Sequence, residues 1–390
     1  MSIQTVYVLI GVFAAILAGL YIFVIYSKIA QAHRTKVQVT YTQTIRPAVE
    51  DLSTAPDADY SELHQTYVAV ARKNMKKKAY HTALEAILLE YLEESGQERR
   101  QRVLKIAYDL ELPCLCLAQI ESRNNRNVAF GCRKAGLYQY VEAVPRMLGA
   151  LSILSSETQF QILMGLSRIG DVNAMCQAFN TISRYIMANE RAVSEILEAF
   201  PGNKQELFQR MIHSEEEYVA ALFIKSLDRD VMKFLAGDIT GILESGGKEM
   251  RIAAIKAIGS MDENIPIVQL REALTDEDWE VRAMAAKALG AQVDPEGGAA
   301  LATALHDPEW WVRQNAAFAL LSYPDCEELF LSMIETKDAY ARDSIVNALE
   351  SAEKSYILVK IQQALADIAE EENVEYVAEF LKDRDYALPV

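Results

Sequence analysis

The chain has 390 residues, of which 51% are hydrophobic, and its formal net charge at pH 7 is −16. The charge is unevenly divided, with a net +3 over residues 1–210 and −19 over residues 211–390. An acidic surface repels polyanions, so this composition argues against nucleic acid as a partner of the distal half.

The N-terminal segment predicts a transmembrane helix. Residues 6–26 carry no charge, and at about 1.5 Å per residue they can cross a bilayer core of roughly 30 Å. Residues 1–5 then form a short extracytoplasmic tail. The alternative is a cleavable signal peptide, because Ala30, Gln31 and Ala32 have the form of a cleavage site. No basic residue precedes the apolar run, and the run exceeds the usual length of about 7–15 residues, so we favour an uncleaved anchor.

The flanking charges predict the orientation of this anchor. Lys28, Arg34 and Lys36 follow the apolar segment, and no basic side chain precedes it. The positive-inside rule therefore places the N-terminus outside and the rest of the chain in the cytoplasm, as in a single-pass protein of the bacterial inner membrane. Five cysteines, an odd number without a disulfide framework, agree with a reducing compartment.

Small residues line one face of the predicted span. Gly11, Ala15 and Gly19 fall at positions i, i+4 and i+8, and such a face allows another transmembrane helix to approach closely. The sequence thus suggests homo- or hetero-association through this helix. The alternative is the ordinary small-residue content of a membrane helix.

A juxtamembrane segment and linker are predicted for residues 27–60, with the next helix starting near Asp59 or Ser61 because the preceding residues are polar.

A basic cluster follows, made of Arg72, Lys73, Lys76, Lys77 and Lys78. Two interpretations are open. The cluster contacts anionic lipid of the inner leaflet, with up to roughly 1 kcal/mol for each basic residue, or it is a solvated helix face.

From residue 212 to residue 349 the sequence repeats with a period close to 31 residues. One position recurs in five successive units: Ala220, Arg251, Arg282, Arg313 and Arg342. Four residues later the side chain is always apolar: Ile224, Ile255, Ala286, Ala317 and Val346. Six residues earlier lies a residue able to cap a helix N-terminus: Ser214, Ser245, Asp276, Asp307 and Thr336. Each unit therefore predicts a helical hairpin whose second helix has an apolar face.

A unit this short cannot bury its own apolar face, so the repeats must stack. The predicted fold is all-α, an α-solenoid of helical hairpins preceded by one transmembrane helix. Residues 61–211 read as irregular repeats, and residues 212–390 as regular repeats with a C-terminal cap. Ala286 and Ala317 are expected at tight contacts between successive units.

The repeated unit, with its Asp, Val-Arg and Ala-rich helix, resembles the short HEAT-like repeats of bacterial proteins and of the phycobilin lyase relatives. The resemblance implies a ladder between repeats, formed in such families by an Asp and an Arg six residues later. Asp276 with Arg282 and Asp307 with Arg313 fit that pattern, whereas Arg251 lacks the Asp. The fold is implied strongly over residues 212–349 and the function hardly at all, because such solenoids are widely reused.

Enzymes also occur among relatives of this repeat class. The deoxyhypusine hydroxylase type holds iron through His-Glu dipeptides, and this sequence contains none. Neither a zinc-protease motif nor a phosphate-binding glycine loop is present. Cys114 and Cys116 lack a second ligand pair, and we interpret them as buried core thiols. We therefore expect no catalytic residues, no metal and no cofactor.

The three tryptophans gather in adjacent units. Trp279 and Trp310 are equivalent positions, and Trp311 follows directly. One interpretation is a partner-binding patch that includes Arg282 and Arg313, since Trp and Arg often dominate binding energy. In the other interpretation Trp279 and Trp310 are wedged between units and the arginines belong to the ladder. Trp311 is the tryptophan most expected to be exposed.

Together these features predict a membrane-anchored cytoplasmic HEAT-repeat scaffold that binds or positions a protein partner, such as a membrane enzyme or a signalling complex. The alternative is a HEAT-like enzyme related to bilin lyases. The sequence does not identify the partner.

Overall fold

The computed structural model describes residues 3–94, 96–152, 154–182, 189–260, 267–334, 338–354 and 356–360, and every regular element there is helical. The chain divides into two compact units. Unit 1 comprises residues 1–186 and 195–202, and unit 2 comprises residues 187–194 and 203–390. The predicted boundary between irregular and regular repeats, at residue 212, lies close to this division. The predicted C-terminal cap falls, from residue 361 on, outside the described residues.

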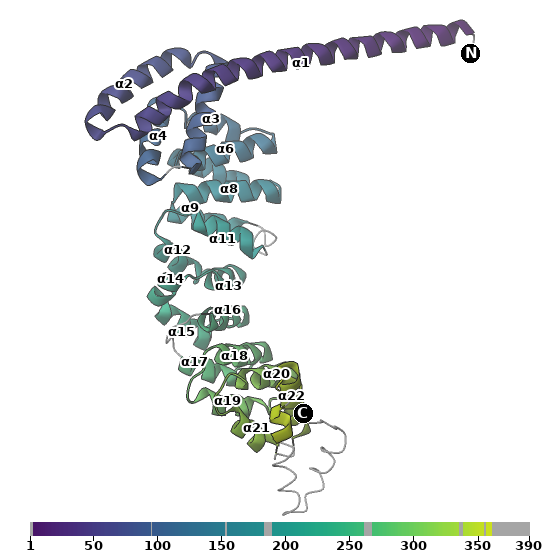
Figure 1. Ribbon diagram of the computed structural model, residues 1–390, viewed down its shortest axis with the longest axis vertical. Helices are drawn as coiled ribbons and strands as arrows, with labels where there is room; N and C mark the ends of the chain where they lie inside the picture. The colour runs from purple at the N-terminus through teal and green to yellow at the C-terminus, as the bar shows by residue number, and fades with distance from the viewer. Residues whose placement is uncertain are drawn as a thin grey trace, which may run out of the picture. The chain divides into compact units, whose positions relative to one another are not determined.

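The first helix is much longer than the predicted span. Helix α1 (Ile3–Thr54) has 52 residues and runs without a break through most of the segment predicted as juxtamembrane segment and linker (Figure 1). It ends where Pro56 precedes α2, which begins at Asp57. Only Ala55 and Pro56 separate the two helices. Pro56 fits the N-terminus of α2, and the acidic residues Asp57 and Asp59 stabilise its first turn.

The C-terminal part of α1 belongs to the core of unit 1. Ile45, Val49 and Leu52 are buried, and this part of α1 packs against α3 (Lys78–Glu94) and α4 (Gln97–Asp109). The Arg46 guanidinium donates two hydrogen bonds, of 2.7 and 2.6 Å, to the Glu90 carboxylate on α3. The apolar N-terminal part and the packed C-terminal part of α1 thus form one continuous helix.

Further helices complete unit 1. They are α2 (Asp57–Asn74), α5 (Leu115–Ile120), α6 (Asn125–Leu137), η1 (Val141–Ala143), α7 (Val144–Leu151), α8 (Ser156–Ile169) and α9 (Val172–Thr181). Helices α6 and α8 approach closely at two glycines, since a Cβ atom on Gly136 would lie 2.7 Å from the Cα of Gly165. A buried ion pair joins α3 to α6, with 2.6 Å between Lys134 Nζ and Glu85 Oε1.

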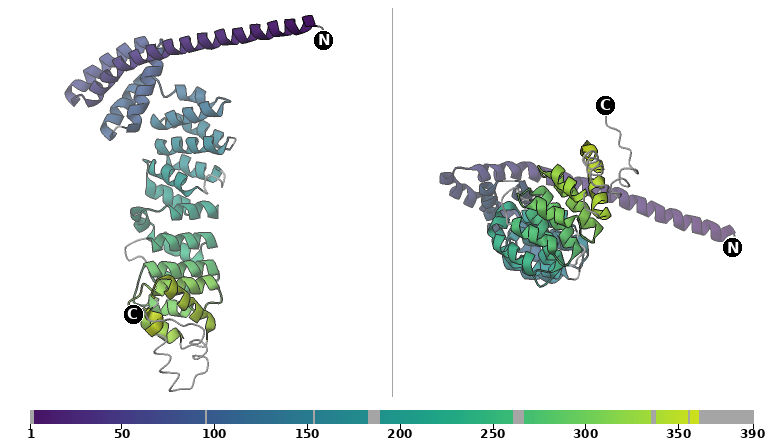
Figure 2. Two further views of the ribbon diagram at one scale, coloured as in Figure 1. Left: turned by 45° about the vertical axis from the view of Figure 1, so that its right-hand side comes forward. Right: turned by 90° about the horizontal axis from the view of Figure 1, so that it is seen from below.

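Unit 2 contains the regular repeats, and α11 (Glu190–Glu198) is shared between the two units. Its helices are α12 (Lys204–Met211), α13 (Glu217–Lys225), α14 (Arg229–Phe234), α15 (Ala236–Ser245), α16 (Lys248–Gly259), α17 (Ile267–Glu272), η2 (Ala273–Thr275), α18 (Trp279–Ala291), α19 (Gly297–Ala304), α20 (Trp310–Leu320), α21 (Cys326–Ile334) and α22 (Ala339–Ser351). Helices α13, α16, α18, α20 and α22 stack in that order, each on the next (Figures 1 and 2).

These five stacked helices are the second helices that the period predicted, and each contains one recurring anchor position. Ile255, Ala286 and Ala317 are fully buried, which agrees with their expected place at the seams between units. The all-α fold of stacked helical hairpins is therefore confirmed over the described residues.

The predicted helix caps are displaced. The carboxylate of Asp276 accepts the backbone N–H of Asp278 at 2.9 Å, and Asp307 accepts that of Glu309 at 2.8 Å. Both helices begin one residue after these donors, so the aspartates shape the turn before the helix, as Asx turns do. Ser245 instead ends α15, and Thr336 lies outside the described residues.

Candidate functional site

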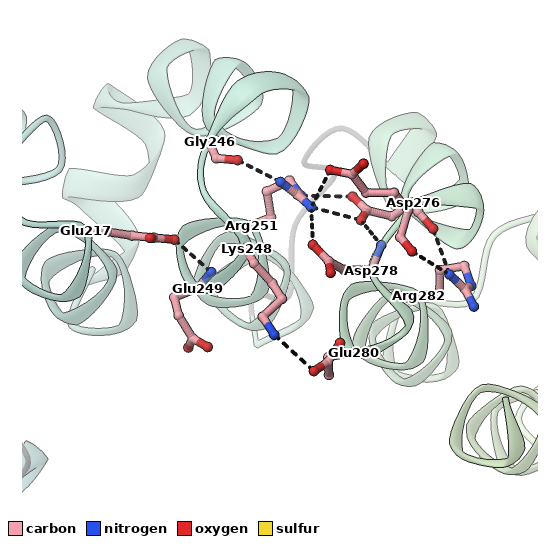
Figure 3. Close-up of polar contacts among 10 residues, drawn as sticks. Glu217, Gly246, Lys248, Glu249, Arg251, Asp276, Asp278, Glu280 and Arg282 are labelled. Carbon is pink, nitrogen blue, oxygen red and sulfur yellow. Dashed lines mark hydrogen bonds and ion pairs between the residues drawn. The ribbon is translucent and has the colours of Figure 1, made fainter.

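A ladder of arginines and aspartates joins successive units along the stacked helices. Arg251 on α16 donates to the Gly246 carbonyl in its own unit at 2.8 Å. Its guanidinium also lies 2.9 Å from the carboxylates of Asp276 and Asp278 in the next unit (Figure 3). Arg251 was expected to have no partner in the ladder because no Asp precedes it by six residues. It pairs instead with Asp276 and Asp278 of the following unit.

Arg282 repeats the arrangement one unit later. It donates to the Asp276 carbonyl at 2.8 Å and pairs with the Asp307 carboxylate at 2.6 Å. The side-chain hydrogen bond to Asp307 raises the pKa of Arg282 above its ordinary value, so the guanidinium stays charged. This side chain is engaged within the molecule, as the ladder interpretation predicted, and its place in a partner-binding patch stays a prediction.

Arg313 is also engaged within the molecule. It is buried, donates to the Asp307 and Pro308 carbonyls at 2.8 Å, and its guanidinium carbon lies 5.1 Å from the centre of the Tyr340 ring. These contacts fit the interpretation of Arg313 as a structural residue, and its role in direct partner contact stays a prediction. Both arginines position the turns that precede the exposed aromatic residues.

The tryptophans lie where α18 and α20 begin. Trp310 and Trp311 are exposed to 48% and 55%, with their ring centres 4.6 Å apart in an edge-to-face arrangement, while Trp279 is half-buried. The expectation that Trp310 is wedged between units is wrong. As the first residue of α20, it extends beyond the helix end, because helical side chains lean toward the N-terminus, and small residues such as Ala316 fill the seam.

Two further aromatic side chains belong with these tryptophans. Phe318, exposed to 42%, lies two turns after Trp311 on the same face of α20, and Tyr340, exposed to 70%, is the second residue of α22. The sequence offered a signal that we did not use, because Tyr340 occupies in its unit the position that Trp311 occupies in the preceding one. We refer to Trp310, Trp311, Phe318 and Tyr340 as the aromatic cluster.

The basic cluster lies at the turn between α2 and α3. Arg72 donates to the Asp109 carbonyl at 2.7 Å, so it also holds α2 against α4. The four lysines Lys73, Lys76, Lys77 and Lys78 are exposed. Nearby, the Tyr80 ring packs 5.5 Å from the ring of Tyr41, which places this turn beside α1.

The small residues of the predicted span are only partly described. Gly11 and Gly19 are exposed, and no other group lies within 4 Å of a Cβ atom built on either. The side chain of Ala15 lies outside the described residues. The described part of α1 from Ile16 to Thr54 is long and apolar enough to cross a membrane, by length and composition only, and a signal sequence passes the same test.

Within the described ranges, no group of three or more His, Cys, Asp or Glu residues is arranged to hold a metal ion.

Cys116 is buried as expected, whereas Cys114 is exposed, which corrects its assignment to the core. Burial raises the pKa of the Cys116 and Cys132 thiols to about 12. Both therefore remain protonated and unreactive at neutral pH.

Comparison with known proteins identifies the repeats. Residues 239–322 match the family of HEAT repeats, so this part of the all-α chain consists of HEAT repeats. No curated protein sequence matches it. The phycobilin-lyase relationship remains a resemblance.

Three solved structures are similar at low identity. One engineered protein is 16% identical over 77% of this chain and 94% of its own, with a TM-score of 0.34. Human deoxyhypusine hydroxylase in complex with glycerol is 15% identical over 76% and 99%, with a TM-score of 0.27. A second engineered protein is 17% identical over 62% and 96%, with a TM-score of 0.22. These values carry no inference about function.

Proposed function

We propose that the chain is a membrane-anchored, non-catalytic scaffold whose cytoplasmic HEAT repeats bind a protein partner through the aromatic cluster. HEAT repeats generally mediate protein–protein interactions, and one observation carries the proposal further. Four large aromatic side chains are exposed on the neighbouring helices α20 and α22, although such residues usually bury themselves. Aromatic side chains of this kind supply most of the energy at protein interfaces.

Electrostatics adds to the proposal. Residues 211–390 carry a net charge of −19, so a partner with a basic surface would be steered toward unit 2 at low ionic strength. We do not include lipid contact by the basic cluster in this proposal. The cluster lies beside Tyr41, which at about 1.5 Å per residue is roughly 22 Å along α1 from Tyr26 at the end of the apolar segment. This distance exceeds the Debye length of about 8 Å at physiological salt, over which charges attract the lysines to anionic lipid.

The anchor and its orientation are tested by a reporter fused after Val390 that is active only in the periplasm. We expect no reporter activity and a mature N-terminus at Met1, because Lys28, Arg34 and Lys36 follow the apolar segment. Strong periplasmic activity would reverse the orientation. A mature N-terminus at His33 would show that the segment is a signal peptide.

The aromatic cluster is tested by Trp311→Ala. The substitution should weaken partner binding by about 2 kcal/mol, roughly 30-fold, as truncation of an interface anchor does. The melting temperature should change little, since the Trp311 side chain is exposed. The measurement is recovery of co-purified membrane proteins per folded chain, together with melting curves. Phe234→Ala is the matched control, because Phe234 is exposed to 50% on α14, outside the cluster. Equal loss in both variants would refute the assignment.

A further inference from the structure

An apolar groove separates the C-terminal part of α1 from α2. Its volume is about 920 Å³, and it runs along α1 from Thr40 to Leu52 and along α2 from Asp59 to Asn74. The stretch of α1 is roughly 18 Å long at 1.5 Å per residue, about three helical turns. These dimensions suit the helix-in-groove mode of recognition, in which one amphipathic helix lays its apolar face between two others.

Apolar side chains on the α2 wall are left in solvent. Leu63 is exposed to 48% and Val70 to 54%, and both line the groove. The walls are held in place from behind, α1 by the Arg46–Glu90 ion pair and α2 by the hydrogen bond from Arg72 to Asp109. The groove is therefore preformed, so an incoming helix need not first order it.

The charges at one end of the groove define the occupant further. Asp51, Asp59 and Glu62 line the groove near the turn between α1 and α2, and none of them forms an ion pair with another described residue. A helix lying there gains stability from lysine or arginine at this level. A second copy of this chain is disfavoured, because two copies anchored in parallel would bring their acidic ends together.

The groove also lies in line with Gly19 of the apolar segment. At 3.6 residues per turn, Thr44 and Ala48 project within about 20° of Gly19 around the axis of α1. One straight helix could therefore pass Gly19 inside the membrane and continue beside Thr44 in the cytoplasm. Gly19 permits the contact inside the membrane because it has no side chain, and the groove permits the contact beside Thr44.

We propose that this groove binds the cytoplasmic extension of a transmembrane helix from a second, different membrane protein. The extension has an apolar face toward Leu63 and Val70, and lysine or arginine beside Asp51, Asp59 and Glu62. The proposal rests on the proposed anchor and is independent of the aromatic cluster.

The test is site-specific photocrosslinking of the full-length chain in its native membranes. Benzoylphenylalanine replaces Thr44 on one wall or Val70 on the other. Both positions should give the same adduct, with one integral membrane protein crosslinked about 18 residues beyond its transmembrane segment, on a helix that carries lysine or arginine. Gln43 is the matched control position, because it is exposed on α1 and lies outside the groove, and it should give no adduct.

Two substitutions test the chemistry of the groove. Leu63→Glu and Asp59→Lys should each lower the adduct yield from Thr44 at least about tenfold, while helicity is unchanged. The first places a charge against the apolar face of the incoming helix, and the second repels its basic residues. Adducts with a second copy, with lipid or with soluble proteins, or equal yields at Gln43, would overturn the proposal, as would the absence of any adduct. Trp311→Ala should leave the yield unchanged, and a mature N-terminus at His33 would mark failure of the anchor instead.

Discussion

Replacing Glu85 with leucine should lower the free energy of unfolding of unit 1 by about 3–5 kcal/mol. The side chains of Lys134 and Glu85 are exposed to only 4% and 12%, and the ion pair between them measures 2.6 Å. Without Glu85, the Lys134 ammonium keeps a ring contact with Phe130, at 4.4 Å, but loses its only anionic partner among the described residues. A buried charge left in this state is costly because water cannot solvate it.

The double variant Glu85→Leu with Lys134→Met gives the matched comparison. It removes both charges and keeps similar volume, so its stability should return to within about 1 kcal/mol of the parent, or exceed it. Glu206→Gln is the surface control, because the Glu206–Arg210 pair is largely exposed and contributes about 0–1 kcal/mol. Urea unfolding of the full-length chain in detergent measures all three. Equal stability of the single and double variants would refute the argument.

This ion pair was beyond sequence analysis, and the reason lies in the repeats. In unit 2 the period aligns Arg251 with Arg282 and so indicates which side chains meet. Unit 1 is irregular, and no register links Glu85 on α3 to Lys134 on α6. Lys134 reads as one of many charged residues until the packing of α6 is known.

The arginine ladder was predictable in kind but not in its pairing. The period identified Arg251, Arg282 and the aspartates, because stacking repeats the same contact along the solenoid. The spacing within one unit suggested that Arg251 lacked a partner. The structure pairs it with Asp276 of the next unit, since a side chain on the stacked face reaches the neighbouring unit as well as the start of its own.

The exposure of the tryptophans shows a further limit of a repeat pattern. The pattern located the three tryptophans in neighbouring units, yet it left open whether Trp310 was wedged between units or exposed to a partner. Burial depends on the place of a residue in its helix, and α20 begins at Trp310.

Replacing Ala317 with tryptophan should destabilise unit 2 by about 3 kcal/mol, at the upper end of the usual effect of overpacking. Ala317 is fully buried on α20, which packs against both α18 and α22. The seam is tight, since a Cβ atom on Gly290 of α18 would lie 2.7 Å from the Cα of Ala319. An indole ring at Ala317 therefore has no space unless a neighbouring helix moves away.

The neighbouring position supplies the control for this substitution. Phe318→Trp introduces the same ring one residue later, where the side chain is exposed to 42%, and should change stability by no more than about 0.5 kcal/mol. Melting curves of the two variants compare the buried and exposed faces of α20 directly. If Ala317→Trp unfolded like the parent chain, α20 would present a different face to its neighbours. The ladder and the aromatic cluster would then both need reassignment, because their places follow from the same helix orientation.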